Sequence, residues 1–373
     1  MLSSIFEQFV QESPISVMAR VLMERVFAPE RIDKLFDTHA IVQYQQDLLF
    51  SSQVDLMSLV VCGIHPSVHA AYKAKAIDKS VSTTALYNKL SGIELGVSQA
   101  LVRETSNDLV SLVEVMGGEQ PSLLPGYRLK IVDGTCLAGT DRRLNAIRAF
   151  AAKALPGKAI VVLDSKAKLV TDIFPCVDGH AQERSLFDEV LSQVKSQELW
   201  CGDRNFCTAK FLFTIASKKG FFVIRQHGGL GFRELSELKP LGETETGKLF
   251  EQEIEISYEG ETLQVRRVLL KLFIPTRDKE WEIAILTNLP FGDADAAKIA
   301  ELYQNRWSLE NLFQTVTENF NGEIQTLAYP KAALFSFSMA LVAYNILATI
   351  RSALGSVHGA SKIEVGLSDF YLA

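Results

Sequence analysis

The sequence lacks the marks of several functional classes. Its 373 residues contain only five cysteines, an odd number, and no Cys-x-x-Cys spacing, so neither a zinc site nor a disulfide framework is expected. The net charge is −6, which argues against a protein that coats nucleic acid through overall basicity but is compatible with a local basic surface. The N-terminus carries no signal-peptide pattern. We therefore expect a reduced, cytoplasmic protein with buried thiols.

One long apolar run, residues 332–350, is about long enough to cross a bilayer. It stands alone, contains Ser336, Ser338, Asn345 and Thr349, and closely follows a polar segment with helical spacing. These polar side chains favour a buried core helix over a membrane span. We therefore expect no membrane partner.

Residues 1–120 are predicted to form a helical N-terminal domain, because apolar residues recur there at helical spacing. Ser82 can cap a short helix, Gly92 can form a turn, and residues 97–115 follow as a longer helix. Two interpretations remain open, plain helical packing and a DNA-binding helix–turn–helix. The second would use three side chains as DNA contacts: Tyr87, Lys89 and Arg103.

The pattern changes to α/β in residues 121–227. Three short runs rich in Val, Ile and Leu predict successive strands, and helices and strands alternate after them. That order is typical of a mixed sheet with flanking helices. Residues 228–280 alternate with period two and predict a β-rich insertion, after which residues 281–373 return to the core with a strand and a long helix begun at Asp293 or Asp295. The predicted fold class is therefore α/β.

The segment YQNRWSLENLFQTVTENF places three polar side chains on one narrow stripe of the predicted helix. Counted from Tyr303 at about 100° per residue, Arg306 and Glu310 fall at about −60° and −20°. An arginine and a glutamate four residues apart also form an ordinary ion pair that stabilises a helix by a few tenths of a kcal/mol. The stripe is therefore either a solvated helix face or part of a site.

Two aspartates end predicted strands, Asp133 in LKIVDG and Asp203 in LWCGD. Sites in open α/β sheets form at the carboxyl ends of strands, although most such aspartates only cap a helix or shape a turn. Together with Glu310 they would provide the oxygen ligands that Mg²⁺ prefers, and paired ions of this kind catalyse phosphoryl transfer. A nuclease or a two-carboxylate glycosidase is the alternative class of enzyme.

These residues give the chain a resemblance to a known family. It resembles the DDE transposases of bacterial insertion sequences, specifically the insertion-sequence-4 group, whose signature is Y-x2-R-x3-E-x6-K. Tyr303, Arg306 and Glu310 match that signature in type and spacing, and VDGT at Asp133 and GDRNF at Asp203 match the two aspartate motifs. The stretch PCVDGHAQERSLFDEVL is also similar to such proteins, without an assigned chemistry.

The resemblance implies an RNase H-like catalytic core and cut-and-paste DNA transposition. A transposon end would be nicked, and its 3′-hydroxyl would be transferred to target DNA by two-metal-ion chemistry. Asp133, Asp203 and Glu310 would be the catalytic residues and would bind Mg²⁺ or Mn²⁺, while Tyr303 and Arg306 would contact the DNA end. The implied partners are double-stranded DNA and a second copy of the chain, in a bacterial cytoplasm.

Four further residues are candidate DNA contacts. Thr317 stands where the signature has lysine, and a threonine can hydrogen-bond a phosphate but lacks the charge. Arg142 and Arg143 belong to the most basic stretch, which either faces DNA or is a solvated surface. Trp307 either stacks on an extruded base or packs in the core beside Leu309.

Two other functions stay open besides transposition. Transposases of this kind usually continue with a C-terminal segment that pairs two subunits, whereas this sequence ends soon after the Glu310 helix. A truncated, inactive remnant that binds DNA is therefore one alternative. A metal-dependent nuclease without strand transfer is the other.

Overall fold

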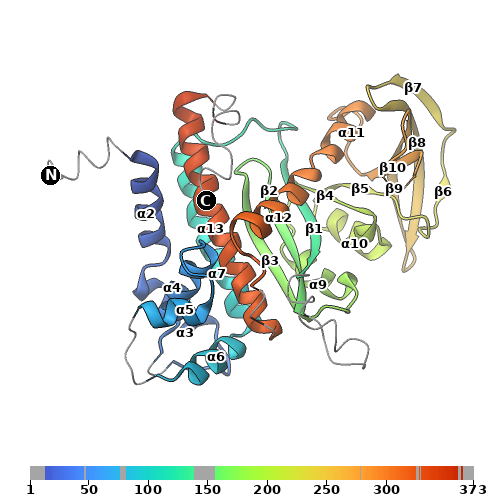
Figure 1. The fold of residues 1–373 in the computed structure, drawn as a ribbon. Coiled ribbons are helices and arrows are strands. Elements are labelled where there is room, and N and C mark those ends of the chain that lie inside the picture. Colours follow the sequence, from blue (N-terminus) through green and yellow to red (C-terminus); the bar gives the residue numbers. More distant parts are fainter. Residues whose placement is uncertain are drawn as a thin grey trace.

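A computed structural model describes residues 13–45, 48–75, 81–137, 156–277, 279–324, 327, 329–359 and 363. The strands in these residues form one ten-stranded mixed sheet flanked by helices (Figure 1). The strands are β1 (Arg128–Cys136), β2 (Pro156–Asp164), β3 (Leu169–Asp178), β4 (Glu198–Gly202), β5 (Phe221–Arg225), β6 (Arg233–Glu234), β7 (Lys239–Glu243), β8 (Gly247–Tyr258), β9 (Glu261–Leu272) and β10 (Glu282–Thr287).

The strand order is β3-β2-β1-β4-β5-β10-β9-β8-β6, with β7 paired to β8. β1, β2 and β3 are antiparallel neighbours, as three successive strands predict, whereas β4 and β5 run parallel to β1. The predicted β-rich insertion is not a separate sheet. Its strand β9 pairs with β10, and β10 pairs with β5, so the insertion extends the sheet that carries the strand-end aspartates.

Helices form the described part of the chain before β1. They are α2 (Pro14–Val26), α3 (Pro29–His39), α4 (Phe50–Val61), α5 (Val68–Ala74), α6 (Thr83–Gly92) and α7 (Leu95–Val115). The predicted cap is confirmed, because the Ser82 hydroxyl accepts the N–H of Ala85 at 3.1 Å. α7 packs on β3, and Arg103 donates to the carboxylate of Asp172 on that strand at 2.7 Å. Arg103 is thereby committed to an internal ion pair instead of the DNA contact that a helix–turn–helix would require.

Each face of the sheet packs against its own set of helices. On one face lie α7 and α13 (Pro330–His358), whose apolar side chains meet Leu129 and Ile131 of β1. On the other face lie α9 (Phe187–Ser192) and α10 (Ala209–Ser217), which pack against Val132 and its neighbours. The side chains of β1 therefore alternate between two cores, as a strand in the middle of a layered fold must.

The long apolar run is the core of α13. Its most apolar 18-residue window passes the length and composition test for a membrane span, yet 89% of that window is buried inside the protein. Asn345 in the middle of α13 is fully buried and bonds the backbone of Val170 twice, accepting its N–H and donating to its carbonyl, both at 2.8 Å. β3 is the edge strand, so Asn345 provides the partners that a further strand would provide.

Asn345→Leu should therefore destabilise the protein by about 3 kcal/mol. The substitution leaves a buried N–H and a buried carbonyl of Val170 without partners, and each such group costs about 1–3 kcal/mol. Urea unfolding followed by circular dichroism measures the change. Ser338→Ala is the matched control on the same helix, since within the described part of the chain the Ser338 hydroxyl bonds only the carbonyl of Leu334 one turn earlier. Equal losses in the two variants would contradict the role given to Asn345.

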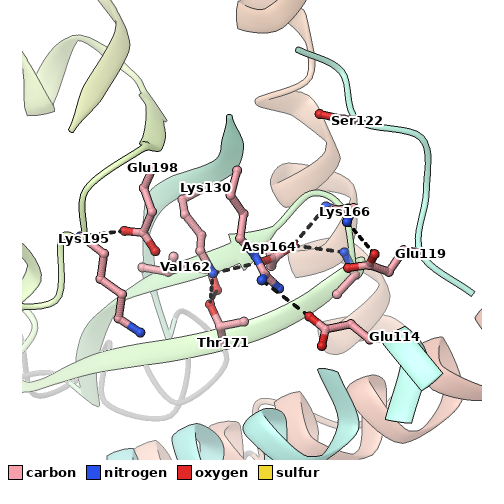
Figure 2. A network of polar contacts seen from close by, with 12 residues as sticks. Glu114, Glu119, Ser122, Lys130, Val162, Asp164, Lys166, Thr171, Lys195 and Glu198 are labelled. Atoms are coloured by element: carbon pink, nitrogen blue, oxygen red, sulfur yellow. Dashed lines mark hydrogen bonds and ion pairs between the residues drawn. The ribbon is translucent and has the colours of Figure 1, made fainter. Parts of the chain in front are cut away.

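A buried carboxylate fixes the amino end of β1 to the end of β2 (Figure 2). The Asp164 side chain is fully buried; one oxygen accepts from the side chains of Arg128 at 2.5 Å and Lys130 at 2.9 Å, and the other accepts the N–H groups of Lys166 and Ala167 at 3.0 Å. Burial alone would raise the pKa of Asp164, but Lys130, the Ala167 N–H and Arg128 outweigh it and hold that pKa below its usual value. This network keeps β1 in place.

All five cysteines carry free thiols. Cys201 and Cys207 are buried as expected, and burial raises the pKa of the Cys201 thiol to about 12. Cys136 at the end of β1 is exposed, so the expectation of buried thiols is wrong for that residue.

Candidate active site

The two strand-end aspartates belong to neighbouring parallel strands. β1 and β4 pair in a register that ends with Val132 beside Gly202, and the next residues along the two strands are Asp133 and Asp203. Neighbouring strands lie about 4.8 Å apart, and alternate side chains point to the same face. Asp133 follows Ile131 by two residues and so faces the side of the sheet that carries α13. Both aspartates therefore lie at one carboxyl edge of the sheet.

The predicted long helix is two helices, α11 (Ala296–Gln304) and α12 (Trp307–Asn319). Asp295 begins α11, because its carboxylate accepts the N–H of Lys298 at 2.8 Å. Between the helices, the N–H of Arg306 bonds the carbonyl of Tyr303, and the N–H of Leu309 bonds that of Arg306. These bonds reach back three residues rather than four, so the backbone tightens and the prediction of one continuous helix is wrong.

Arg306 at this junction brings the third carboxylate to the first. α12 lies over β1 (Figure 1). The Nη1 atom of Arg306 lies 3.0 Å from Oδ2 of Asp133, and its Nη2 atom lies 2.6 Å from Oε1 of Glu310. Its carbon Cζ stands 5.9 Å from the centre of the Tyr303 ring. Tyr303, Arg306 and Glu310 therefore remain neighbours across the junction of α11 and α12, and Arg306 contacts Asp133.

Asp133 is the electrostatic centre of this group. The pKa of Asp133 is raised to about 7: burial contributes most, the charge of Arg306 and the N–H of Gly134 oppose it, and the charges of Asp203 and Glu310 add to the rise. The pKa of Arg306 is also raised, because Tyr303, Asp133 and Glu310 outweigh the effect of its burial, so the guanidinium stays charged. The charges of Asp203 and Glu310 both reach Asp133, so the three predicted acidic residues lie in one region of the protein.

The three carboxylates suit a divalent cation in kind and in charge, because Mg²⁺ prefers oxygen ligands. Their positions in this structure do not form a complete ligand group. Within the described residues, no three His, Cys, Asp or Glu side chains are grouped closely enough to hold a metal ion. The Arg306 guanidinium instead bridges Asp133 and Glu310 and neutralises them. The Nε atom of Arg306 is buried and has no acceptor among the described residues.

The remaining predicted site residues fall into different surroundings. Trp307 is 65% exposed, so the alternative of a core tryptophan is wrong. It lines an apolar cavity of about 520 Å³ between α11 and strands β9 and β10, and Tyr303, only 7% exposed, lines the same cavity. Thr317 is exposed farther along α12. Arg142 and Arg143 lie outside the residues that the structure describes.

Two lysines of the predicted basic stretch have structural partners. Lys158 is buried and donates to the carbonyl of Ala181, and Lys166 pairs with Glu119 at 2.5 Å (Figure 2). Neither ammonium group is left free to face DNA.

A cavity of about 640 Å³ lies apart from the carboxylates, at the amino ends of β1 and β4. It is lined by Arg103, Lys130 and Glu198, among others, and the first two are paired with Asp172 and Asp164. Figure 2 shows this end of β1. Arg103 and Lys130 are thus engaged in ion pairs within the protein.

Glu183 is a carboxylate near the site that was not predicted from the sequence. Glu183 begins the short 3-10 helix Glu183–Leu186, and its Oε2 atom accepts from Nδ2 of Asn205 at 3.4 Å. Burial raises the pKa of Glu183, and the charge of Asp203 adds to that rise. The available signal was the stretch PCVDGHAQERSLFDEVL, which contains Glu183 but could not place it beside Asp203.

Comparison with known proteins assigns the chain to a family. The family model of the transposase DDE domain matches residues 124–346, more than half of the chain, a range that contains Asp133, Asp203 and Glu310. No curated protein matches the chain. Among solved structures, the chain is similar to the cryo-EM structure of a piggyBac transposase synaptic complex with hairpin DNA, at 10% identity and a TM-score of 0.36, over 95% of this chain and 83% of that one.

Proposed function

Because the chain belongs to the transposase DDE domain family, we propose that it moves a DNA element by cut-and-paste transposition. It nicks the element's ends, and the freed 3′-hydroxyl attacks target DNA. The observation that carries the proposal is the ion pairing of Arg306 with both Asp133 on β1 and Glu310 on α12, next to the neighbouring strand end that carries Asp203. The finer assignments, to the insertion-sequence-4 group, an RNase H-like core and a homodimer on DNA, belong to the same proposal.

Asp133, Asp203 and Glu310 would hold Mg²⁺ or Mn²⁺. The bound ions would activate the attacking oxygen and stabilise the leaving oxygen of the phosphodiester. The protein's part is to place three carboxylates from β1, β4 and α12 at one point. The Asp133 side chain, 15% exposed against 51% for Glu310, is held on β1 at the carboxyl edge of the sheet.

Arg306 is the residue that responds to the substrate. In this structure it neutralises Asp133 and Glu310 and leaves its Nε atom buried without an acceptor. With Asp133 and Glu310 engaged as metal ligands, the guanidinium of Arg306 would be available to a DNA phosphate beside the cleaved bond, where bidentate charge-assisted hydrogen bonds are strong. Tyr303, nearly buried below it, supports the guanidinium and has little surface for a direct DNA contact.

The flanking DNA contacts follow from exposure and charge. Thr317 is exposed on α12 and can give a phosphate a neutral hydrogen bond, weaker than the ion pair of a lysine. Arg142 and Arg143 remain predicted phosphate contacts. Trp307 presents an exposed indole next to an apolar cavity, which suits stacking on a base displaced from the duplex.

Trp307→Ala should weaken binding to the element's end DNA about tenfold or more, because stacking a base on an aromatic ring contributes about 1–3 kcal/mol. Its stability should change little, since the side chain is 65% exposed. Fluorescence anisotropy with labelled end DNA measures the affinity. Trp281→Ala is the matched control, because Trp281 is 58% exposed and does not line the cavity. Equal weakening in both variants would rule out a specific base contact for Trp307.

One assay separates the proposal from its rivals. Purified protein is incubated with Mg²⁺ or Mn²⁺ and DNA bearing the element's own terminal repeats, together with a target plasmid. Transposition predicts nicks at the repeat ends followed by joined products on gels. Cleavage without joining would identify a nuclease, and end-specific binding without cleavage would identify an inactive remnant.

A further inference from the structure

Gly134, the residue after Asp133, leaves space that another side chain fills. A Cβ atom built on Gly134 would lie 2.5 Å from Oε1 and 2.6 Å from Cδ of Glu183, distances that real Cβ atoms do not show. The obstacle is the end of a flexible side chain rather than backbone. An alanine at position 134 could therefore be accommodated, but only if the Glu183 carboxylate moved away.

The other oxygen of Glu183 reaches toward the second aspartate. Oε2 of Glu183 accepts from the side-chain amide of Asn205 at 3.4 Å, and the backbone N–H of Asn205 donates to Oδ1 of Asp203 at 2.8 Å. Asn205 thus contacts both carboxylates, one through its side chain and one through its backbone. Glu183 consequently contacts β1 directly and the turn of Asp203 through one residue.

The segment that carries Glu183 is held in place from both sides. The ammonium group of Lys158 on β2 donates to the carbonyl of Ala181, two residues earlier. After Glu183, the ring of Phe187 stacks on that of Phe206 with centroids 5.2 Å apart and an angle of 19°. Phe206 ends the 3-10 turn Arg204–Phe206, which Asp203 caps. The turn of Asp203 and the segment of Glu183 are therefore packed as one unit.

We propose that Glu183 is a positioning residue of the active site: its carboxylate, seated against Gly134, fixes the turn of Asp203 through Asn205. The glycine after Asp133 is required because it leaves room for that carboxylate. This inference rests on the proposed function, since it assigns Glu183 a role toward the residues that would hold the cations. Residues that orient metal ligands typically change metal affinity or activity by about 10–100-fold when they are removed.

Four variants test this role: Glu183→Ala, Glu183→Gln, Gly134→Ala and the double variant Gly134→Ala/Glu183→Ala. Mn²⁺ affinity by calorimetry and end cleavage by gel assay are the two readouts, with thermal unfolding to verify the fold. Glu183→Ala and Gly134→Ala should each lower both readouts about 10–100-fold. Glu183→Gln should stay near wild type, because its amide oxygen still accepts from Asn205. The double variant should be no worse than Glu183→Ala, because the added methyl group no longer meets a carboxylate.

Two further variants serve as controls for the role of Glu183. Glu189→Gln changes an exposed glutamate of the following helix α9 and should alter neither readout. Asp203→Asn removes a proposed ligand itself, so retained Mn²⁺ affinity in that variant would overturn the proposed function. If Asp203→Asn loses Mn²⁺ while Glu183→Ala binds and cleaves like wild type, only the role of Glu183 is overturned. If Gly134→Ala lowered Mn²⁺ affinity and end cleavage by the same factor in the wild-type protein and in Glu183→Ala, the role of Glu183 would also be overturned.

Discussion

Glu310→Gln is expected to abolish end cleavage while leaving the protein folded. The carboxylate would help to neutralise charge in the transition state, and a loss of about 4 kcal/mol there slows the reaction about a thousandfold. Stability should hardly change, because the Glu310 side chain is 51% exposed and its described partner is Arg306, one turn away. An arginine–glutamate pair four residues apart on a helix contributes about 0.2–0.5 kcal/mol, and Arg306 keeps Asp133 as its other partner. Single-turnover cleavage of end DNA measures the rate.

Asp203→Asn should lose cleavage to the same extent for the same reason. An asparagine side chain can still cap the short turn that follows, as Asp203 does by accepting the N–H of Asn205. Glu318→Gln is the matched control, since Glu318 is an exposed glutamate of α12 whose carboxylate accepts from Gln314 on the same helix. Cleavage that survives Glu310→Gln or Asp203→Asn would overturn the assignment of the three carboxylates.

The parts of this site that sequence predicted are those governed by local periodicity. The ends of β1 and β4 could be read from runs of apolar residues, and their parallel register then places Asp133 beside Asp203. Helical spacing placed Arg306 near Glu310, because four residues make about one turn. The strand ends and the Arg306–Glu310 spacing depend on neighbours in the chain, whereas the pairing of β1 with β4 joins distant segments and is known only from the structure.

The contacts that sequence could not predict join distant segments. Glu183 meets Gly134 only because the segment after β3 folds back over the end of β1, and no spacing encodes that meeting. Trp307 was expected beside Leu309 in the core, yet the tight junction before α12 leaves it exposed. The position of Arg103 in its helix is compatible with an exposed cation, but the side chain forms an ion pair with Asp172 on β3. For Glu183 and Arg103 a partner far along the chain decides the role.

Asp164→Asn should produce the largest loss of stability, about 3–5 kcal/mol at neutral pH. The substitution removes the carboxylate with which Lys130 forms its buried ion pair, and breaking such a pair on one side costs that much. Urea unfolding at pH 7 measures the loss. Asp188→Asn is the matched control, since Asp188 is 73% exposed in its pair with Lys210 and should contribute about 0–1 kcal/mol.

The contribution of Asp164 to the stability of the protein depends on pH. The pKa of Asp164 is lower in the folded protein than in the unfolded chain, because Lys130, the Ala167 N–H and Arg128 together outweigh burial. Its contribution is therefore fully present above the unfolded value of about 3.9 and is lost as the pH falls through the folded value. Wild type should lose stability over that acid range, and Asp164→Asn should lose less. Parallel curves for the two proteins would show that Asp164 does not act through its charge.

Adding Lys130→Met to Asp164→Asn should recover part of the loss. The single variant leaves a buried ammonium group without its partner, whereas an apolar side chain of similar size removes that cost, as replacements of buried ion pairs by apolar groups often do. Since Lys130 lies on β1 three residues before Asp133, the same comparison bears on the active site. If Asp164→Asn lowered cleavage and the double variant regained both stability and cleavage, the network would be shown to hold β1, and through it Asp133, in place.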